Sequence, residues 1–348
     1  MALRNPTQRS RRSFLEHAAA AGGLGLGALL AGCNSQSSGD GPRKRLRAAF
    51  SNGGLQGTWC KLGHDAAMLW GKLLDVEVVW FDGEFNAQKQ REKLDLMVDD
   101  DWDFCAVQSH QSGTLEEPVK QLKKRGIPVI SLDTLLVEHD RLREVGVWMQ
   151  ISPDQTGMAE KSVQYMMDKI GGRGKVIHIG GDSAHSGAQQ RSQGFENILA
   201  KYRDTVEVVG GGVRWCEWKT ETARNTFTAL LGQSDEPIAG AFFHNDDMAL
   251  ACTKAIEGTI HKDMVITAVD GQKPGLTGVK DGLLAATAIN PAGMIHGYGL
   301  IVGQFIVRNQ EKLEDLPLEI ILPCPLVCRE AGNVDAMLYL SDPAHCLV

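Results

Sequence analysis

Residues 238–255 read I-A-G-A-F-F-H-N-D-D-M-A-L-A-C-T-K-A. The run begins with a short apolar segment, residues 239–243, which is typical of a buried parallel strand, and an amphipathic helix follows from about Met248. A buried strand that leads directly into a helix is half of a βαβ unit, and ligands of such units bind beyond the carboxyl ends of the strands. Asn245 and Asp246 fall at this position.

Four consecutive polar residues, His244 to Asp247, separate this strand from its helix. Asn245 or Asp246 could cap the helix, because a side-chain oxygen at that position accepts a hydrogen bond from a free backbone N–H. A cap needs one such side chain and the cluster holds more, so we also expect contact with a small polar ligand. We interpret His244 and Asp247 as supporting or capping residues.

Strand and helix patterns alternate on both sides of this stretch. One series runs over residues 46–133 and a second over residues 152–307, with short links between the elements. Such alternation predicts parallel sheets covered by helices on both faces. The sequence therefore predicts an α/β protein with two doubly wound, Rossmann-like lobes, and 348 residues suffice for two domains of ordinary size.

Composition and motif content exclude several classes of function. The chain is 43% hydrophobic and 23% charged, as expected of a globular protein, and its net charge of −7 argues against a nucleic-acid partner. No nucleophile–base pairing, phosphate-binding glycine loop or metal-ligand spacing is recognisable in the sequence. We therefore predict no catalytic residue, no cofactor and no metal.

The first 33 residues have the pattern of an export signal. Arg11 and Arg12 lie in S-R-R-S-F-L (10–15), which resembles a twin-arginine signal, and L-A-G-C (30–33) resembles the lipobox of bacterial lipoproteins. The apolar segment between them is too short for a membrane span. We expect lipidation at Cys33 and a flexible tether over residues 34–45. The alternative is an ordinary cleaved signal in which Cys33 is incidental.

Polar side chains stand at the carboxyl ends of several predicted strands, where a small polar ligand could bind. Carboxylates and amides pair with ligand hydroxyls, and aromatic rings pack on apolar ligand faces. Asp133 and Asp270 could instead be helix caps or turn residues, and Arg191 could be a solvated helix residue. The strand-end and helix-start residues are Gln108, Asp133, Asn245, Asp270, Asn290 and Arg191.

Several segments resemble, in order and spacing, the type I periplasmic sugar-binding proteins, the ribose-binding group. The resemblance covers about Leu46 to Glu330 and implies a chain that crosses a hinge three times. One lobe would comprise residues 46–151 and 291–321, the other residues 152–290 and 322–330, while residues 331–348 stay unassigned. The segments are I-P-V-I-S-L-D (127–133), Q-R-S-Q-G-F (190–195), G-A-F-F-H-N-D-D-M-A-L-A (240–251), V-I-T-A-V-D-G-Q (265–272) and D-G-L-L-A-A-T-A-I-N-P (281–291).

The resemblance also implies a set of ligand contacts. Trp59, expected in the first loop, and Trp218 would stack on the sugar, although burial in the core is the commoner fate of a tryptophan. Thr134 stands where the ribose pattern has an Arg, and Val269 where an aromatic residue is usual, which implies a wider or differently polar pocket. The positions that match the family's contacts are Trp59, Gln108, Asp133, Arg191, Trp218, Asn245, Asp270 and Asn290.

By this resemblance the chain is a monomeric, lipid-anchored solute-binding protein on the periplasmic or extracytoplasmic side. It would capture a monosaccharide or related polyol and deliver it to an ABC-type permease in the inner membrane. A sensory receptor that presents its closed form to a chemoreceptor or sensor kinase is the alternative. A repressor of this fold requires a basic helix-turn-helix where the signal and tether stand, and a glycosidase would use Asp133 and Asp270 as its carboxylate pair. Cys324, Cys328 and Cys346 could form one disulfide.

Overall fold

The computed structural model describes residues 44–342 and 344–345. The described residues from Arg45 onward form one compact unit. The predicted export signal, Cys33, nearly all of the predicted tether and Cys346 lie outside the described residues, so the predictions about them stay predictions. Within the described part of the chain, no helix combines the length and the apolar character that a membrane span requires.

The first sheet has six strands in the order β12-β5-β4-β3-β1-β2, and every neighbouring pair is parallel. Its central strands are apolar at almost every position, and Phe50, Ala106 and Ile130 are fully buried. This is the pattern of parallel strands that are covered on both faces. The strands are β1 Leu46–Asn52, β2 Val76–Asp82, β3 Phe104–Val107, β4 Val129–Leu132, β5 Val147–Pro153 and β12 Glu319–Leu322.

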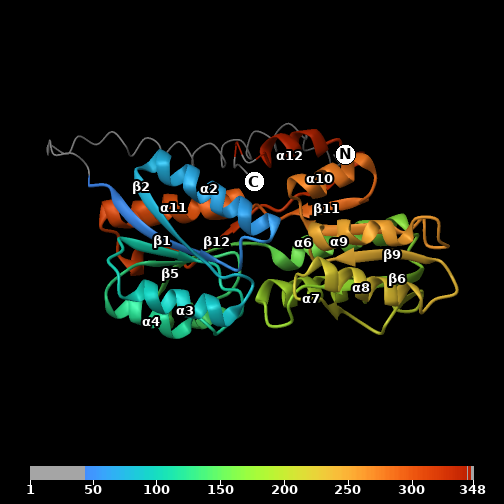
Figure 1. Cartoon of the computed structure of the whole chain (residues 1–348), viewed down its shortest axis with the longest axis horizontal. Coiled ribbons are helices and arrows are strands. Elements are labelled where there is room, and N and C mark those ends of the chain that lie inside the picture. The colour runs from blue at the N-terminus through green and yellow to red at the C-terminus, as the bar shows by residue number, and fades with distance from the viewer. Residues whose placement is uncertain (1–43, 343, 346–348) are drawn as a thin grey trace, which may run out of the picture. The chain divides into compact units, whose positions relative to one another are not determined.

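Helices cover both faces of this first sheet (Figure 1). α2 and α11 pack together on one face, and α3, α4 and α5 pack on the other. A Cβ at Gly63 of α2 would lie 2.2 Å from His296 of α11, so glycine at this position permits the close approach of the two helices. The elements are α2 Thr58–Leu74, α3 Ala87–Val98, α4 Glu116–Lys124, η2 His139–Arg141, α5 Leu142–Val145, α11 Ala292–Asn309 and η4 Leu313–Asp315.

The second sheet has seven strands in the order β13-β11-β10-β9-β6-β7, with β8 paired to β6. β13 runs antiparallel to β11, so this sheet differs from the wholly parallel one that the sequence predicts. The residues are apolar on both faces, as in the first sheet. The strands are β6 Gly174–Gly180, β7 Val206–Val208, β8 Arg214–Trp215, β9 Ile238–Phe243, β10 Val265–Asp270, β11 Ala286–Ile289 and β13 Leu326–Cys328.

The second sheet is also covered on both faces. α6 and α7 pack on one face, and α8, α9, α10 and α12 on the other. α12 belongs to the tail that the sequence left unassigned. Val334 of α12 is buried against this core. The ion pairs Lys273–Asp342 and Lys280–Asp335 join this tail to α10. The elements are α6 Gln155–Lys169, α7 Ser186–Leu199, α8 Thr220–Leu231, α9 Asp246–Cys252, η3 Thr253–Ile256, α10 Lys273–Asp281, η5 Arg329–Ala331 and α12 Val334–Leu340.

The chain passes between the two sheets three times, from β5 to α6, from β11 to α11 and from β12 to β13. We call the first sheet with its helices the first lobe and the second sheet with its helices the second lobe. The predicted α/β fold with two doubly wound lobes is confirmed. The residue numbers predicted for the lobe boundaries remain a prediction.

Two local expectations differ from the structure. Trp59 lies in the first turn of α2 and not in the preceding loop, because the helix already begins at Thr58. Cys324 and Cys328 are both free and buried, so no disulfide joins them. Cys60, Cys105 and Cys252 are buried thiols, as expected of cysteines within strand and helix patterns.

Candidate ligand-binding site

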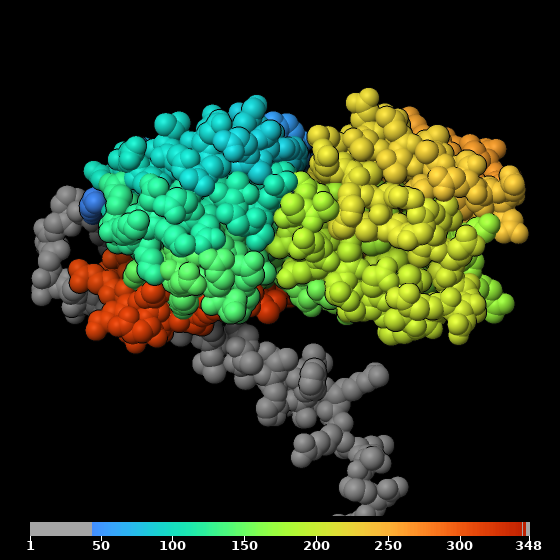
Figure 2. All heavy atoms as spheres, turned by 90° about the horizontal axis from the view of Figure 1, so that it is seen from below, coloured from blue at the N-terminus to red at the C-terminus, as the bar shows by residue number. Residues whose placement is uncertain are grey.

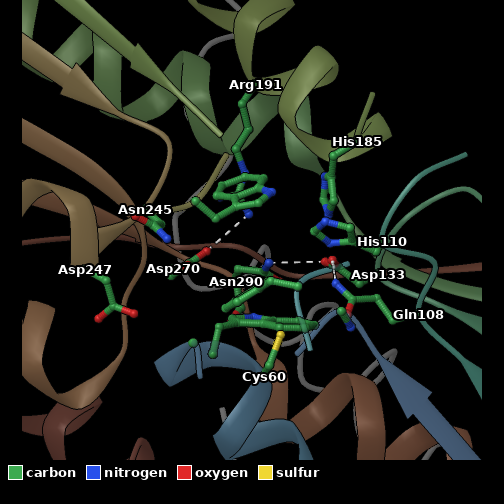
Figure 3. Close-up of a pocket in the computed structure, with 15 residues that line it drawn as sticks. Cys60, Gln108, His110, Asp133, His185, Arg191, Asn245, Asp247, Asp270 and Asn290 are labelled. Carbon is green, nitrogen blue, oxygen red and sulfur yellow. Dashed lines mark hydrogen bonds and ion pairs between the residues drawn. The ribbon is translucent and has the colours of Figure 1, made fainter. Parts of the chain in front are cut away.

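A cavity of about 60 Å³ lies between the two lobes (Figure 3). One water needs about 10–15 Å³ by this measure, so the cavity has room for several waters or for one compact small molecule. All eight residues that the sequence predicts as ligand contacts line it, although their role in binding stays a prediction. The lining is Gly53, Gly57, Trp59, Cys60, Phe85, Gln108, His110 and Asp133 from the first lobe, His185, Arg191, Trp218, Asn245, Asp247 and Asp270 from the second, and Asn290 from a crossing segment.

Asp133 is buried at the end of β4 and accepts hydrogen bonds from three side-chain amides. Its Oδ1 accepts from Gln155 Nε2 at 2.9 Å and from Asn290 Nδ2 at 3.1 Å, and its Oδ2 accepts from Gln108 Nε2 at 2.9 Å. Burial raises the pKa of Asp133, and the charge of Arg191 opposes this rise. Asp133 caps no helix, so the cap considered for it is wrong, but it does stand in a bend after β4 with φ of 60°. One acceptor position of its carboxylate is left for a ligand.

Arg191 on α7 is buried, with 3% of its surface exposed, and is therefore not a solvated helix residue. Its Nε donates to Gln155 Oε1 at 2.8 Å, its Nη1 donates to the carbonyl oxygen of His244, and its Nη2 lies 3.2 Å from Asp270 Oδ1. The guanidinium carbon also lies 5.7 Å from the ring centre of Trp218. These contacts hold the guanidinium at the cavity wall and leave two of its five N–H groups without a protein acceptor among the described residues.

Asp270 ends β10 with φ of 111°, and like Asp133 it caps no helix. The pKa of Asp270 is raised to about 7, mainly by burial; the charge of Arg191 opposes the rise, and the charges of Asp247 and Asp133 add to it. Oδ1 of the carboxylate forms the ion pair with Arg191, so Oδ2 remains as an acceptor at the cavity.

The sequence left open whether Asn245 or Asp246 caps the helix, and in the structure the two residues differ in their contacts. Asn245 is the N-cap of α9, and its Oδ1 accepts from Met248 N at 3.0 Å. Its amide nitrogen faces the cavity, as Figure 3 shows, so this residue combines capping with a free donor. Asp246 turns away, and its carboxylate accepts from Gln272 N at 3.0 Å and from Thr287 Oγ1 at 2.6 Å. Asp246 therefore supports the β9–β10–β11 edge.

The two tryptophans belong both to the core and to the cavity. Trp59 packs into the core of the first lobe and donates its Nε1–H to Asn290 O at 3.0 Å, which fixes the indole as one wall of the cavity. Trp218 lies before α8 with φ of 60° and packs edge-on to His185, with ring centres 5.0 Å apart. Two indole rings from opposite lobes thus form walls of the same cavity.

Direct hydrogen bonds join the lobes around the cavity, and we call them the rim contacts. On one side Asp247 accepts from Thr58 N at 3.1 Å and from Thr58 Oγ1 at 2.8 Å. On the other side Gln111 Nε2 donates to Asp182 Oδ2 at 2.9 Å. Figure 2 shows the two lobes meeting along a seam on one face of the molecule. The structure is therefore a closed arrangement of the lobes.

Residues 48–302 match the family model described as periplasmic binding protein domain. The chain belongs to this family. The resemblance to type I periplasmic sugar-binding proteins that the sequence predicts is thereby confirmed. Members of the family are binding proteins, in agreement with the prediction that the chain is not an enzyme.

Similar proteins extend over most of the chain. A xylitol-binding protein of Mycolicibacterium smegmatis is 26% identical over 320 residues, which cover 92% of this chain and 86% of that protein. A ribose import binding protein of Bacillus subtilis is 25% identical and covers 63% of this chain and 68% of its own length. A galactofuranose binding protein has a structure with TM-score 0.77 at 16% identity, covering 85% of this chain and 98% of that one. The last likeness shows the fold.

The sequence did not point to three of the side chains that line the cavity, namely Phe85, His110 and His185. His185 is the N-cap of α7, and its Nδ1 accepts from Ala188 N at 3.2 Å, so the proton of the neutral ring is on Nε2. Burial lowers the pKa of His185 and of His110. His185 immediately precedes α7, the helix that carries Arg191, and a side chain just before a helix was the available signal.

The described residues contain no group of three or more His, Cys, Asp or Glu side chains arranged to hold a metal ion. The residues that line the cavity provide hydrogen-bond donors, hydrogen-bond acceptors and aromatic faces.

Proposed function

We propose that the protein is an extracytoplasmic solute-binding protein that captures a monosaccharide or related polyol between its lobes and delivers it to an ABC-type permease. One observation carries the proposal: side chains from both lobes bring free donors, free acceptors and two indole rings to a single cavity between the lobes. Names of the relatives support it, since they include a xylitol-binding protein and ribose import binding proteins.

The free polar atoms match the chemistry of a polyhydroxylated ligand. Asn290 Oδ1 is buried and has no hydrogen-bond partner among the described residues, so it would accept from a ligand hydroxyl. Asp270 Oδ2 is a second acceptor, and Arg191 and Asn245 retain N–H donors. A hydroxyl both donates and accepts, so a polyol satisfies both kinds of group, whereas an unpaired buried group costs about 1–3 kcal/mol.

The ligand would be held by closure of the lobes around the three crossing segments. We propose residues 46–151 with 291–321 and residues 152–290 with 322–330 as the bodies that move, because the three crossings lie within a few residues of these boundaries. Hinge closure around a ligand is a common mode of motion in two-lobed binding proteins. Small-angle scattering should show a smaller radius of gyration with ligand, and an unchanged radius with a tightly bound ligand would contradict the hinge.

We further propose export by the twin-arginine route and lipid anchoring through Cys33, which the two N-terminal motifs support. Cys33→Ala should release soluble protein or leave unprocessed precursor, and replacing Arg11 and Arg12 with Lys should block export. Normal lipid labelling of the Cys33→Ala variant would contradict the anchor. The names of the xylitol-binding and ribose import binding relatives indicate uptake and give no support to the alternative sensory role.

The test of the binding function is a thermal-shift screen of residues 34–348 with pentoses, hexoses, xylitol and inositols. A ligand at a hundredfold its dissociation constant should add about 2.7 kcal/mol of stability. Aryl glycosides serve as the control for hydrolysis, and no product is expected. If an amino acid, a peptide or a metal raised the melting temperature while no carbohydrate or polyol did, the sugar-binding proposal would fail.

A further inference from the structure

Gln155 does not line the cavity, yet it joins the charged groups of both lobes. It is the first residue of α6, directly after the crossing from β5, and 2% of its surface is exposed. Its Nε2 donates to Asp133 Oδ1 in the first lobe at 2.9 Å, and its Oε1 accepts from Arg191 Nε in the second lobe at 2.8 Å. One side chain on a crossing segment thus contacts the two oppositely charged groups of the site.

The partners of Gln155 fix the orientation of its amide. The Arg191 Nε–H can only donate, so it requires the amide oxygen, and the acceptor position on Asp133 requires the amide nitrogen. A second amide acts in parallel, because Asn290 on another crossing segment donates to the same Asp133 oxygen at 3.1 Å. Figure 3 shows this Asn290–Asp133 bond beside the Arg191–Asp270 pair. The hydrogen bonds run without a break from Gln108 through Asp133, Gln155 and Arg191 to Asp270.

We propose that Gln155 is a positioning residue that couples the two halves of the binding site. It holds Asp133 and Arg191 in one fixed relation in the closed arrangement, and so determines the geometry of donors and acceptors that a hydroxylated ligand meets. That a hydroxylated ligand binds here rests on the proposed function. The coupling of Asp133 to Arg191 through Gln155 rests on geometry alone.

The surroundings of Gln155 are adapted to its amide group. A Cβ at Gly187 in the first turn of α7 would lie 3.1 Å from both the Cδ and the Nε2 of Gln155, so glycine leaves the space that the amide occupies. Asp154 caps α6 by accepting from Gly157 N at 2.8 Å, which fixes the backbone just before Gln155. An apolar side chain of similar length would fill the same space, but it would leave Arg191 Nε–H without its acceptor and Asp133 with one donor fewer.

A first test needs no ligand and compares Gln155→Met and Gln155→Glu with the parent chain. Loss of a donor raises the pKa of the Asp133 carboxyl in the folded state, and a neighbouring carboxylate raises it further. An acid whose pKa is higher in the folded state loses stability as pH rises above about 4, so the melting temperature of both variants should fall more steeply than that of the parent between pH 5 and pH 8. Each unit by which the pKa of Asp133 rises in the folded state corresponds to a loss of about 2–4 °C in melting temperature. The loss should be larger in Gln155→Glu than in Gln155→Met.

Gln164 provides the matched control, since it lies on the same helix and donates to the exposed Asp168 at 2.7 Å. Gln164→Met and Gln164→Glu should keep the pH profile of the parent. Gly187→Ala is a milder third variant that displaces the Gln155 amide without removing it, and it keeps the test decisive if a Gln155 variant does not fold. Parallel pH profiles for all variants and the parent would overturn the coupling.

The second test measures binding of xylitol and D-ribose by tryptophan fluorescence at neutral pH. Gln155→Met should lower the affinity for whichever of the two ligands binds the parent by about tenfold or more, as expected for loss of a hydrogen bond to a charged group. Gln164→Met should bind that ligand with the affinity of the parent. Unchanged affinity in Gln155→Met would refute the positioning role. If neither sugar bound the parent, these two ligands would be excluded for the proposed function, and the pH profiles would still decide the coupling.

Discussion

Replacing Asp270 with Asn should make the protein more stable and its binding weaker. Asp270 Oδ1 lies 3.2 Å from Arg191 Nη2 in a buried site that also contains Asp133. The amide has nearly the same shape and keeps an acceptor toward Arg191. It removes one buried negative charge and leaves Arg191 and Asp133 as a balanced pair, so the folded state no longer has to hold two carboxylates beside one guanidinium.

The size of the stability change follows from the pKa of Asp270, which burial raises from 3.8 to about 7. A carboxyl whose pKa is higher in the folded state binds its proton more tightly there, so the contribution of Asp270 to stability declines as pH rises from about 4 to about 7. Two pH units within that window correspond to about 3 kcal/mol. The Asn variant does not titrate, so its melting temperature relative to the parent should rise by about 6 °C or more between pH 5 and pH 8.

Binding should change in the opposite direction. An ionised carboxylate makes a hydrogen bond of about 1.5–3 kcal/mol with a ligand hydroxyl, and a neutral amide makes one of about 1 kcal/mol, so the Kd of Asp270→Asn should rise about tenfold. Melting curves across the pH range and titration calorimetry with the sugar found by screening measure the two effects. Identical pH slopes for variant and parent, or an undiminished affinity at pH 8, would refute the reasoning about this site.

Three other substitutions examine single features of the site. Asn245→Ser retains a capping oxygen for α9 but loses the amide donor, so calorimetry should show a Kd about five- to tenfold higher at a stability within about 1 kcal/mol of the parent. Thr58→Val removes one rim contact to Asp247 and keeps the backbone one; the ligand-free radius of gyration should increase, and an unchanged radius would show that the rim contact does not hold the lobes together. Ligand should change tryptophan fluorescence, and Trp218→Phe should remove much of that change if its indole faces the ligand.

The sequence predicted the sheets well because parallel strands buried on both faces are short apolar runs, as residues 239–243 illustrate. It also predicted the cavity lining, since the polar residues after such strands meet at one edge of a sheet. Asn245 shows the limit of this reasoning: the capping role is confirmed, because Oδ1 accepts from Met248 N, while the amide nitrogen faces the cavity and its contact with a ligand stays a prediction. A pattern of residue types does not reveal that the two polar atoms of one side chain point toward different partners.

What the sequence did not indicate depends on distances between segments remote in the chain. Gln155 belongs to no motif recognised in the sequence, and its importance arises from Asp133 and Arg191, which lie 22 and 36 positions away. His110 and His185 face the cavity from opposite lobes, with ring centres 6.3 Å apart. The resemblance implied that residues 322–330 return to the second lobe, but local propensity does not encode the direction of pairing, and β13 runs antiparallel to β11.

The rim contacts have a consequence for the lifetime of the complex. They join protein to protein and do not involve a ligand, so the lobes cannot move apart until Thr58 separates from Asp247 and Gln111 from Asp182. The dissociation rate is then set partly by bonds that the ligand never touches. Changes at the rim would alter residence time for every sugar by a similar factor, whereas changes at Asp270 or Asn245 would alter the ranking among sugars.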